Sequence, residues 1–234
     1  MTEFYGELIG TFILIVLGDG VVANISLNKS KGQGAGWVAV ALGWGFAVAV
    51  AVYVSGFMSG AHLNPAVTVG LAMVGMFPWG SVASYIVAQM LGAMAGALLV
   101  WVHYYSHWKE TEDAATILGV FSTGPAIRKT VPNLIGEVIG TAILIIGVMA
   151  MGPNELTSGL GAIVVGIIIT AIGFGLGGTT GYAINPARDL GPRIMHQILP
   201  IANKGDSDWS YSWIPIVGPL IGAVLGALLY NLVL

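Results

Sequence analysis

Two copies of one tripeptide are the residues in this chain whose types and spacing are best suited to chemistry. They are Asn64, Pro65, Ala66 and, 121 residues later, Asn185, Pro186, Ala187. Proline is favoured at the first position of a helix and asparagine is a strong N-cap, so each tripeptide predicts the start of a helix. A helix N-terminus carries partial positive charge, and an asparagine amide beside it can donate hydrogen bonds. Both sites are therefore suited to binding a polar oxygen.

The residue patterns of the common catalytic sites are missing from the sequence. We find no serine–histidine–acid set, no metal-binding cluster and no phosphate-binding loop, and no pair of the four histidines has a convincing zinc spacing. The chain has no cysteine, which excludes disulfides and thiolate catalysis. We therefore expect no enzymatic activity, no cofactor and no metal.

The composition shows which elements must position the two tripeptides. Only 8 % of the 234 residues are charged and 56 % are hydrophobic, whereas a soluble domain is roughly 25 % charged. A soluble globular protein and a disordered chain are both excluded, because each needs more charge. The formal net charge of −3 offers no basic surface for nucleic acid. The sequence predicts an integral membrane protein.

Six apolar stretches are long enough to cross a bilayer, which takes about 20 residues in a helix. They cover residues 4–24, 36–56, 81–105, 132–152, 158–178 and 211–233. Two shorter apolar pieces, 65–76 and 186–197, begin at the asparagine tripeptides. These pieces are too short to span, so we predict that they are re-entrant half-helices.

The chain is an internal repeat. Residues 7–11 recur as 137–141 and residues 91–99 recur as 221–229, both with an offset of 130. Each half has three spans, so the second half must lie upside down relative to the first. The predicted fold is an all-α membrane protein with an inverted 3+3 repeat. We expect one channel-like domain over 1–234, with repeats at about 1–108 and 130–234.

Glycines recur at a spacing of four in several predicted spans. The pairs are Gly6 and Gly10, Gly92 and Gly96, Gly136 and Gly140, and Gly222 and Gly226. Such pairs allow helix backbones to approach closely in lipid, so we predict that they pack helices together.

Two segments of the sequence resemble the signature loops of the major intrinsic protein family, the aquaporins. Residues 62–68 read HLNPAVT and residues 181–189 read GYAINPARD. Together with the six spans and the repeat, the resemblance covers the whole chain. It implies the aquaporin fold, a homotetramer in a plasma membrane, and a passive channel for small neutral solutes that excludes protons and ions. The compact chain suggests a bacterial membrane.

The resemblance also assigns roles around the tripeptides. The amides of Asn64 and Asn185 would donate hydrogen bonds to a permeating oxygen, and their helix ends would repel cations. The irregular backbone before each tripeptide cannot face lipid, so its carbonyl groups would line the pore. These pore-lining residues are Gly60, Ala61, His62, Gly181, Tyr182 and Ala183.

A selectivity filter is expected around Arg188, since an arginine at membrane depth is costly and marks a permeation path. By resemblance the other filter positions are Trp44, Gly173 and Tyr182. Water-selective relatives have histidine where Gly173 stands, so glycine would open the gap. Two aromatic rings opposite an arginine suit glycerol. Alternatively, Arg188 extends to the lipid interface and Trp44 only packs.

Four further charged residues are expected to support the loops. Asp189 and Arg193 have the helical spacing of an ion pair and resemble the glycerol facilitators, as does the pair Pro215–Ile216. Glu7 and Glu137 occupy equivalent places in the two repeats and would accept hydrogen bonds from the re-entrant loops. Asp19 has the apolar Met149 as its repeat equivalent, and the sequence assigns it no role.

The distribution of positive charge conflicts with the orientation of the family. All the basic residues fall in the first, third and fifth connections: Lys29, Lys31, Lys109, Arg128, Lys129, Arg188, Arg193 and Lys204. The positive-inside rule would place these connections in the cytoplasm, whereas the family places them outside. We follow the family, because Arg188 and Arg193 belong to a pore loop.

Three other functions compete with a glycerol channel. A strict water channel is disfavoured by Gly173, Asp189 and the Pro215–Ile216 pair. A coupled secondary transporter would need a titrating carboxylate, for which only Glu7, Asp19 and Glu137 are available. A purely structural membrane protein would not need intact tripeptides and Arg188. Glycerol, dihydroxyacetone, urea, hydrogen peroxide and undissociated lactic acid are all small, neutral and able to hydrogen-bond, and the sequence does not rank them.

Overall fold

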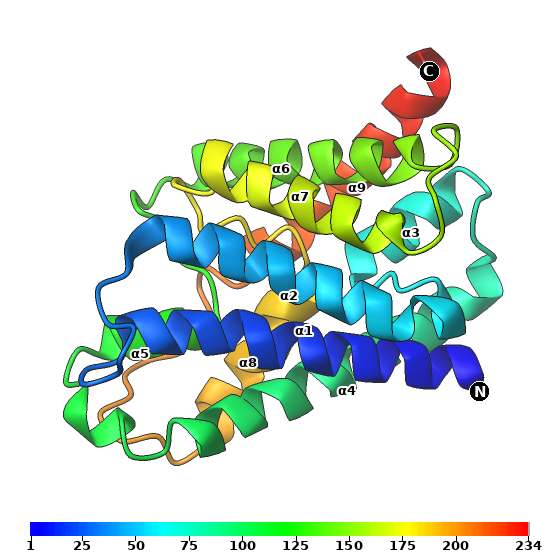
Figure 1. The fold of residues 1–234 in the computed structure, drawn as a ribbon. Helices are drawn as coiled ribbons and strands as arrows, with labels where there is room; N and C mark the ends of the chain where they lie inside the picture. Colours follow the sequence, from blue (N-terminus) through cyan, green and yellow to red (C-terminus); the bar gives the residue numbers. More distant parts are fainter. Residues whose placement is uncertain (234) are drawn as a thin grey trace.

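The computed structural model describes residues 1–233. The regular elements of this part of the chain are helices, and it contains no strand. The long helices are α1 (Thr2–Ser26), α2 (Gly36–Ser59), α4 (Trp79–His103), α6 (Thr130–Ala150), α7 (Leu160–Gly175) and α9 (Ile214–Val233). The half-helices are α3 (Pro65–Met73) and α8 (Pro186–Ile198). The predicted all-α fold is confirmed. Both chain ends lie on the same side of the bundle, as an even number of spans requires (Figure 1).

The long helices differ in their ability to cross a bilayer. Helices α1, α2, α4, α6 and α9 are each long and apolar enough to span, but α7 has only 16 residues. At 1.5 Å per residue α7 is about 24 Å long, less than the predicted 158–178 would give. It begins after Gly159, whose φ of 85° turns the chain, and it ends where the chain turns towards the second re-entrant loop.

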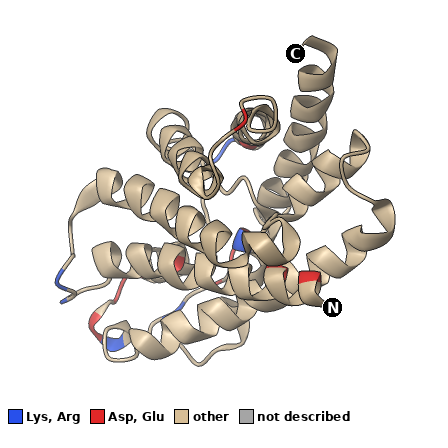
Figure 2. Ribbon diagram, turned by 45° about the vertical axis from the view of Figure 1, so that its right-hand side comes forward, with Lys and Arg blue, Asp and Glu red and all other residues tan. Residues whose placement is uncertain are grey.

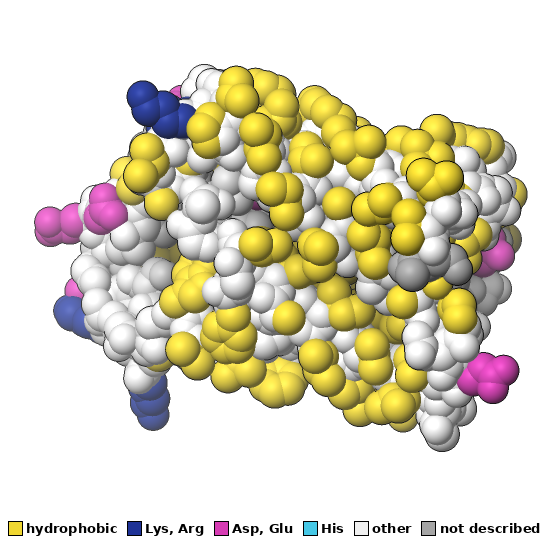
Figure 3. Space-filling view, turned by 90° about the horizontal axis from the view of Figure 1, so that it is seen from above, with side chains coloured by type: hydrophobic (Ala, Val, Ile, Leu, Met, Phe, Trp, Pro, Cys, Tyr) yellow, Lys and Arg dark blue, Asp and Glu magenta, His cyan; other side chains and the backbone are white. Residues whose placement is uncertain are grey.

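The outer surface of the bundle is suited to lipid. Large apolar side chains are exposed on several helices; Phe57, for example, is 86 % exposed. Hydrophobic side chains cover the middle of the molecule, and charged side chains project at its two ends (Figure 3). Lipid would cover this surface, because monomeric soluble proteins rarely expose so large an apolar area.

Equivalent helix pairs of the two repeats pack through glycine. A Cβ atom on Gly92 of α4 would lie 2.3 Å from the carbonyl oxygen of Leu8 in α1, and one on Gly222 of α9 would lie 2.3 Å from that of Val138 in α6. No larger residue fits such a contact, so the predicted packing role of these glycines is confirmed.

The two repeats meet where α2 crosses α7. A Cβ atom on Gly45 would lie 2.7 Å from the Gly166 carbonyl oxygen, and one on Gly166 would lie 2.6 Å from that of Gly45. This pair was absent from the predicted glycine contacts. Its sequence signal is the separation of 121, which is also the separation of the two asparagines.

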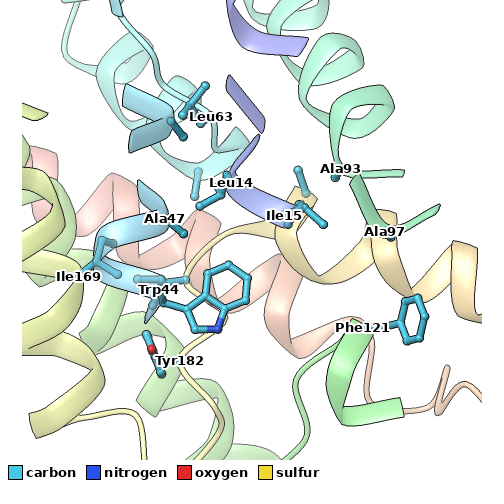
Figure 4. Packing of buried hydrophobic residues seen from close by; sticks show 14 of the residues in the cluster. Leu14, Ile15, Trp44, Ala47, Leu63, Ala93, Ala97, Phe121, Ile169 and Tyr182 are labelled. Atoms are coloured by element: carbon cyan, nitrogen blue, oxygen red, sulfur yellow. The ribbon is translucent and has the colours of Figure 1, made fainter. Parts of the chain in front are cut away.

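The connection between the repeats contains structure that the sequence analysis did not predict. It holds a short 3-10 helix, η1 (Trp108–Glu110), and helix α5 (Ala114–Phe121). Asp113 caps α5: the hydroxyl and the backbone N–H of Thr116 donate to its carboxylate and hold the pKa of that group below its usual value. Phe121 ends α5 and is fully buried in the core (Figure 4).

Candidate functional site

A cavity of about 310 Å³ lies between the two repeats. Its walls include apolar side chains of α1, α2, α6 and α7, among them Leu14, Val48, Leu144 and Ile169. The predicted site residues that line it are Trp44, Gly60, Ala61, His62, Asn64, Gly181, Tyr182, Ala183, Asn185 and Arg188. The fold therefore brings both tripeptides and most of the predicted filter to one cavity.

Each asparagine caps the half-helix that it precedes. The Asn64 side-chain oxygen accepts from the Ala66 N–H at 2.8 Å, and that of Asn185 accepts from the N–H groups of Ala187 at 3.0 Å and Arg188 at 3.2 Å. Proline occupies the first helical position in both cases. Local sequence alone explains this geometry.

The asparagine amides also join the two re-entrant loops. The Asn64 Nδ2 donates to the Ile184 carbonyl at 2.8 Å, and the Asn185 Nδ2 donates to the Leu63 carbonyl at 2.8 Å. An amide nitrogen has two hydrogens, so one N–H of each asparagine is used between the loops and one is left over. The resemblance implied that the amides donate hydrogen bonds to a permeating oxygen, and it gave no indication of this contact between the loops. In the structure, one N–H of each asparagine amide donates to a carbonyl of the opposite loop, and we call this pair of hydrogen bonds the loop brace.

The two re-entrant loops have the same unusual backbone. In the first loop Gly60, Ala61 and Leu63 have φ values of 80°, 51° and 52°. At the equivalent positions of the second loop, Gly181, Tyr182 and Ile184 have values of 82°, 41° and 43°. Left-handed backbone at a residue other than glycine costs about 1–3 kcal/mol, so surrounding contacts must hold both loops in place.

Buried glutamates provide these contacts. The Glu7 carboxylate accepts from the backbone N–H groups of His62 at 2.9 Å and Leu63 at 2.7 Å. The Glu137 carboxylate accepts from those of Ala183 at 3.0 Å and Ile184 at 2.8 Å. These are the hydrogen bonds that the repeat led us to expect.

Glu7 has two additional partners that the sequence did not suggest. Ser59 donates to it at 2.7 Å, and Gln89 of α4 donates at 2.7 Å. Gln89 also reaches Thr68 at 3.0 Å, and Thr68 contacts the Nδ1 of His62 at 3.1 Å. The His62 ring is therefore held within the first loop, packed against Phe77 at a centroid distance of 4.7 Å.

Three of the four predicted filter residues, Trp44, Tyr182 and Arg188, line the cavity. The Arg188 guanidinium lies over the Trp44 ring, 4.0 Å from its centroid, and both side chains are buried. The Arg188 Nη1 donates to the Phe121 carbonyl at 3.2 Å. Trp44 and Tyr182 lie close together beside the cavity (Figure 4). One wall thus combines aromatic surface with a hydrogen-bond donor.

The space beside Gly173 is not the open gap that the sequence predicted, because the Tyr182 ring occupies it. A Cβ atom on Gly173 would lie 3.0 Å from both the Cζ and the hydroxyl of Tyr182. The space left by the missing side chain therefore holds the tip of the Tyr182 ring. Gly173 is not among the residues lining the cavity, and its carbonyl accepts from the Trp37 indole at 2.9 Å. Glycine at position 173 therefore leaves room for the Tyr182 ring to pack against α7.

Asp189 and Arg193 form a fully buried ion pair one turn apart on α8, with the Arg193 Nη2 at 2.8 Å from the Asp189 Oδ1. Asp189 also accepts from the backbone N–H and the hydroxyl of Thr123, each at 2.7 Å. Arg193 donates to the carbonyls of Ser207 at 2.7 Å and Thr123 at 2.9 Å. The pair ties two connecting segments to the half-helix that carries Arg188.

Sequence reasoning missed the partners in these contacts. Phe121, Thr123 and Ser207 contribute mainly backbone groups, which have no sequence signature. Gln89 was the one detectable signal, since an amide side chain in an apolar span must find a partner.

Comparisons with known proteins agree with this arrangement. A family model described as "Major intrinsic protein" matches residues 1–230. Glycerol uptake facilitator protein 3 of Lactiplantibacillus plantarum is 63 % identical over 229 residues, covering 98 % of this chain and 95 % of that relative. The glycerol uptake facilitator protein of Bacillus subtilis is 56 % identical over 231 residues, covering 99 % of this chain and 84 % of that relative.

The structure also resembles the X-ray structure of the aquaglyceroporin from Plasmodium falciparum. The TM-score is 0.89 at 34 % sequence identity, covering 99 % of this chain and 96 % of that chain. The family model covers both re-entrant loops, five of the long helices in full, and α9 as far as residue 230. The chain belongs to the major intrinsic protein family and is a multi-pass membrane protein.

Proposed function

We propose that this protein is a passive channel that conducts glycerol, similar small neutral solutes and water. The observation that carries the proposal is the stacking of Arg188 on Trp44 at 4.0 Å in the wall of the cavity. A polyol has a carbon backbone that packs on an aromatic ring and hydroxyls that accept hydrogen bonds from a guanidinium. The names of the two glycerol uptake facilitators and the aquaglyceroporin support the same substrate.

In this mechanism the two asparagines act at the centre of the path. Each has one amide N–H left over from the loop brace, at the positive end of a half-helix. A passing hydroxyl or water oxygen would accept from both, which turns the molecule and interrupts a chain of water along which protons move. The paired helix ends also oppose the entry of cations.

The contacts of the buried carboxylates favour a channel over a coupled transporter. Glu7 and Glu137 each hold a re-entrant loop through several hydrogen bonds, and Asp19 lies 3.5 Å from Arg188. A coupling carboxylate must bind and release a proton during transport, whereas each of these has a fixed partner. The family consists of passive channels, and we infer no enzymatic activity for this chain.

The proposal extends to the assembly and the location of the protein. We infer a homotetramer in the plasma membrane, with the whole of 1–234 forming one channel domain. The extensive exposed apolar surface provides for contacts with both lipid and neighbouring subunits.

Stopped-flow light scattering on proteoliposomes tests the proposed substrate. We expect both glycerol and water to enter faster than in protein-free liposomes. Fast water flux without glycerol flux would instead identify a strict water channel.

The orientation can be tested by labelling a single cysteine, because the chain has none of its own. Lys109→Cys lies on the exposed part of the connection between the repeats. We expect a membrane-impermeant maleimide to label this variant in intact cells, because the family places the connection outside. Labelling only after the cells are opened would show that the positive-inside rule holds instead.

A further inference from the structure

Asp19 is the buried charge that the transport mechanism does not use. It lies in α1 with no exposed surface, and its Oδ1 is 3.5 Å from the Nη1 of Arg188. Within residues 1–233, neither carboxylate oxygen of Asp19 accepts a hydrogen bond. Figure 2 shows how few charged residues interrupt the helices. A buried carboxylate without other partners is expensive, so its position beside Arg188 requires an explanation.

The residue before Asp19 also serves the filter. The Trp44 ring fills the space beside Gly18: a Cβ atom on Gly18 would lie 2.2 Å from Trp44 Cζ3. Trp44 in turn stacks on Arg188. Neighbouring residues of α1 therefore position both the aromatic ring and the guanidinium.

Both charges are replaced by apolar residues at the equivalent positions of the other repeat. The repeat equivalent of Asp19 is Met149, at the offset of 130, and that of Arg188 is Val67, at the offset of 121. Both equivalents are buried and apolar. One half of the molecule thus has an acid with a base, and the other half has two apolar residues in the same places.

Two carboxylates and two guanidinium groups form two buried ion pairs at the filter. Asp19 and Asp189 carry two negative charges, and Arg188 and Arg193 carry two positive charges. Arg193 is bound by Asp189, which leaves Asp19 as the acidic partner of Arg188. Without Asp19, the guanidinium in the wall of the cavity would carry an uncompensated charge.

We propose that Asp19 is the counter-ion and positioning residue of Arg188, holding the guanidinium on the Trp44 ring and neutralising the filter for uncharged polyols. The selectivity part of this proposal rests on the glycerol channel proposed above. Removing Asp19 alone would leave the Phe121 carbonyl as the polar partner of Arg188, and the guanidinium could then turn from the Trp44 ring towards water. The aromatic surface and the donor would then no longer act together on glycerol, while the smaller water molecule would still pass.

A double-mutant cycle on the purified protein tests the pairing. Asp19→Met and Arg188→Val together reproduce the Met149 and Val67 of the other half. Each single variant is expected to have a lower melting temperature than wild type, and the double variant should recover most of the loss. This follows because removing one partner of a buried pair leaves an unpaired charge, whereas replacing both does not. A double variant whose melting temperature is no higher than that of Asp19→Met overturns the pairing. If Asp19→Met fails to assemble, a double variant that also fails to assemble overturns it.

The same cycle in proteoliposomes tests the role in selectivity. Asp19→Met should lower the ratio of glycerol to water permeability about tenfold in wild type, equivalent to a barrier difference of about 1.4 kcal/mol. It should cause no further decrease in the Arg188→Val background. An unchanged ratio, or an equal decrease in both backgrounds, overturns the proposal.

Thr11→Val is a matched control, since Thr11 is another fully buried polar residue of α1 whose hydroxyl has no hydrogen-bond partner among residues 1–233. It should leave the permeability ratio unchanged; a decrease as large as that of Asp19→Met would assign the effect to α1 packing and overturn the proposal. Absence of glycerol flux in wild type would refute the proposed conduction of glycerol, but the melting-temperature cycle would still decide the pairing.

Discussion

Gly173→His is expected to reduce glycerol permeability at least about tenfold, which corresponds to an increase of about 1.4 kcal/mol in the barrier to glycerol. Water permeability should fall no more than about twofold, because water is the smaller solute. A Cβ atom added at this position would lie 3.0 Å from the Cζ atom and the hydroxyl of Tyr182. The imidazole can be accommodated only if Tyr182 moves, and the cavity with Arg188 and Trp44 lies beside that ring. Stopped-flow measurement of both solutes on the same vesicles gives the two numbers.

Gly178→His is the control for this variant. Gly178 is exposed, and a Cβ atom there would meet no atom within 4 Å, so both permeabilities should match wild type. Equal losses of glycerol and water flux in Gly173→His would mean that the residue does not act on the filter.

Glu137→Leu is expected to abolish conduction of both solutes and to lower the melting temperature. The carboxylate is the acceptor for the buried N–H groups of Ala183 and Ile184, and leaving each N–H unpaired costs about 1–3 kcal/mol. The left-handed backbone at Tyr182 and Ile184 would then relax. Because Ile184 also receives the Asn64 amide, the change would reach the other repeat.

Two further variants check that the effect of Glu137→Leu comes from the loop. Glu137→Gln keeps one acceptor oxygen and should retain an intermediate flux. Glu110→Gln, which removes an exposed carboxylate paired with Lys29 outside the membrane, should behave like wild type. Normal flux in Glu137→Leu would show that the loop holds its shape without the carboxylate.

Most of the fold was predictable because its signals are local or repeated. Apolar length predicted the spans, and the asparagine–proline pairs predicted the starts of α3 and α8. The repeat predicted the positions from which Glu7 and Glu137 reach the loops. Helix α5 escaped prediction because its 8 residues, although mostly apolar, are too short a run to stand out in a polar connection, where only the Asp113 cap marked its start.

The contacts that could not be predicted join residues far apart in the sequence. Nothing beside Asp19 indicates that its partner is Arg188, because α1 and α8 meet only after both repeats have assembled. The brace between each asparagine amide and the opposite loop depends on the same assembly. The position of Tyr182 in the space beside Gly173 requires side-chain coordinates. Tertiary packing, rather than local propensity, decides these features.

The central claim is that glycerol crosses passively through the cavity between the two repeats. The most direct test is the initial rate of glycerol entry into proteoliposomes as the glycerol concentration rises, with and without an imposed proton gradient. Passive conduction predicts an initial rate of glycerol entry that rises linearly with glycerol concentration and is the same with and without the proton gradient. A rate that saturates early, or that disappears when the proton gradient is removed, would contradict it.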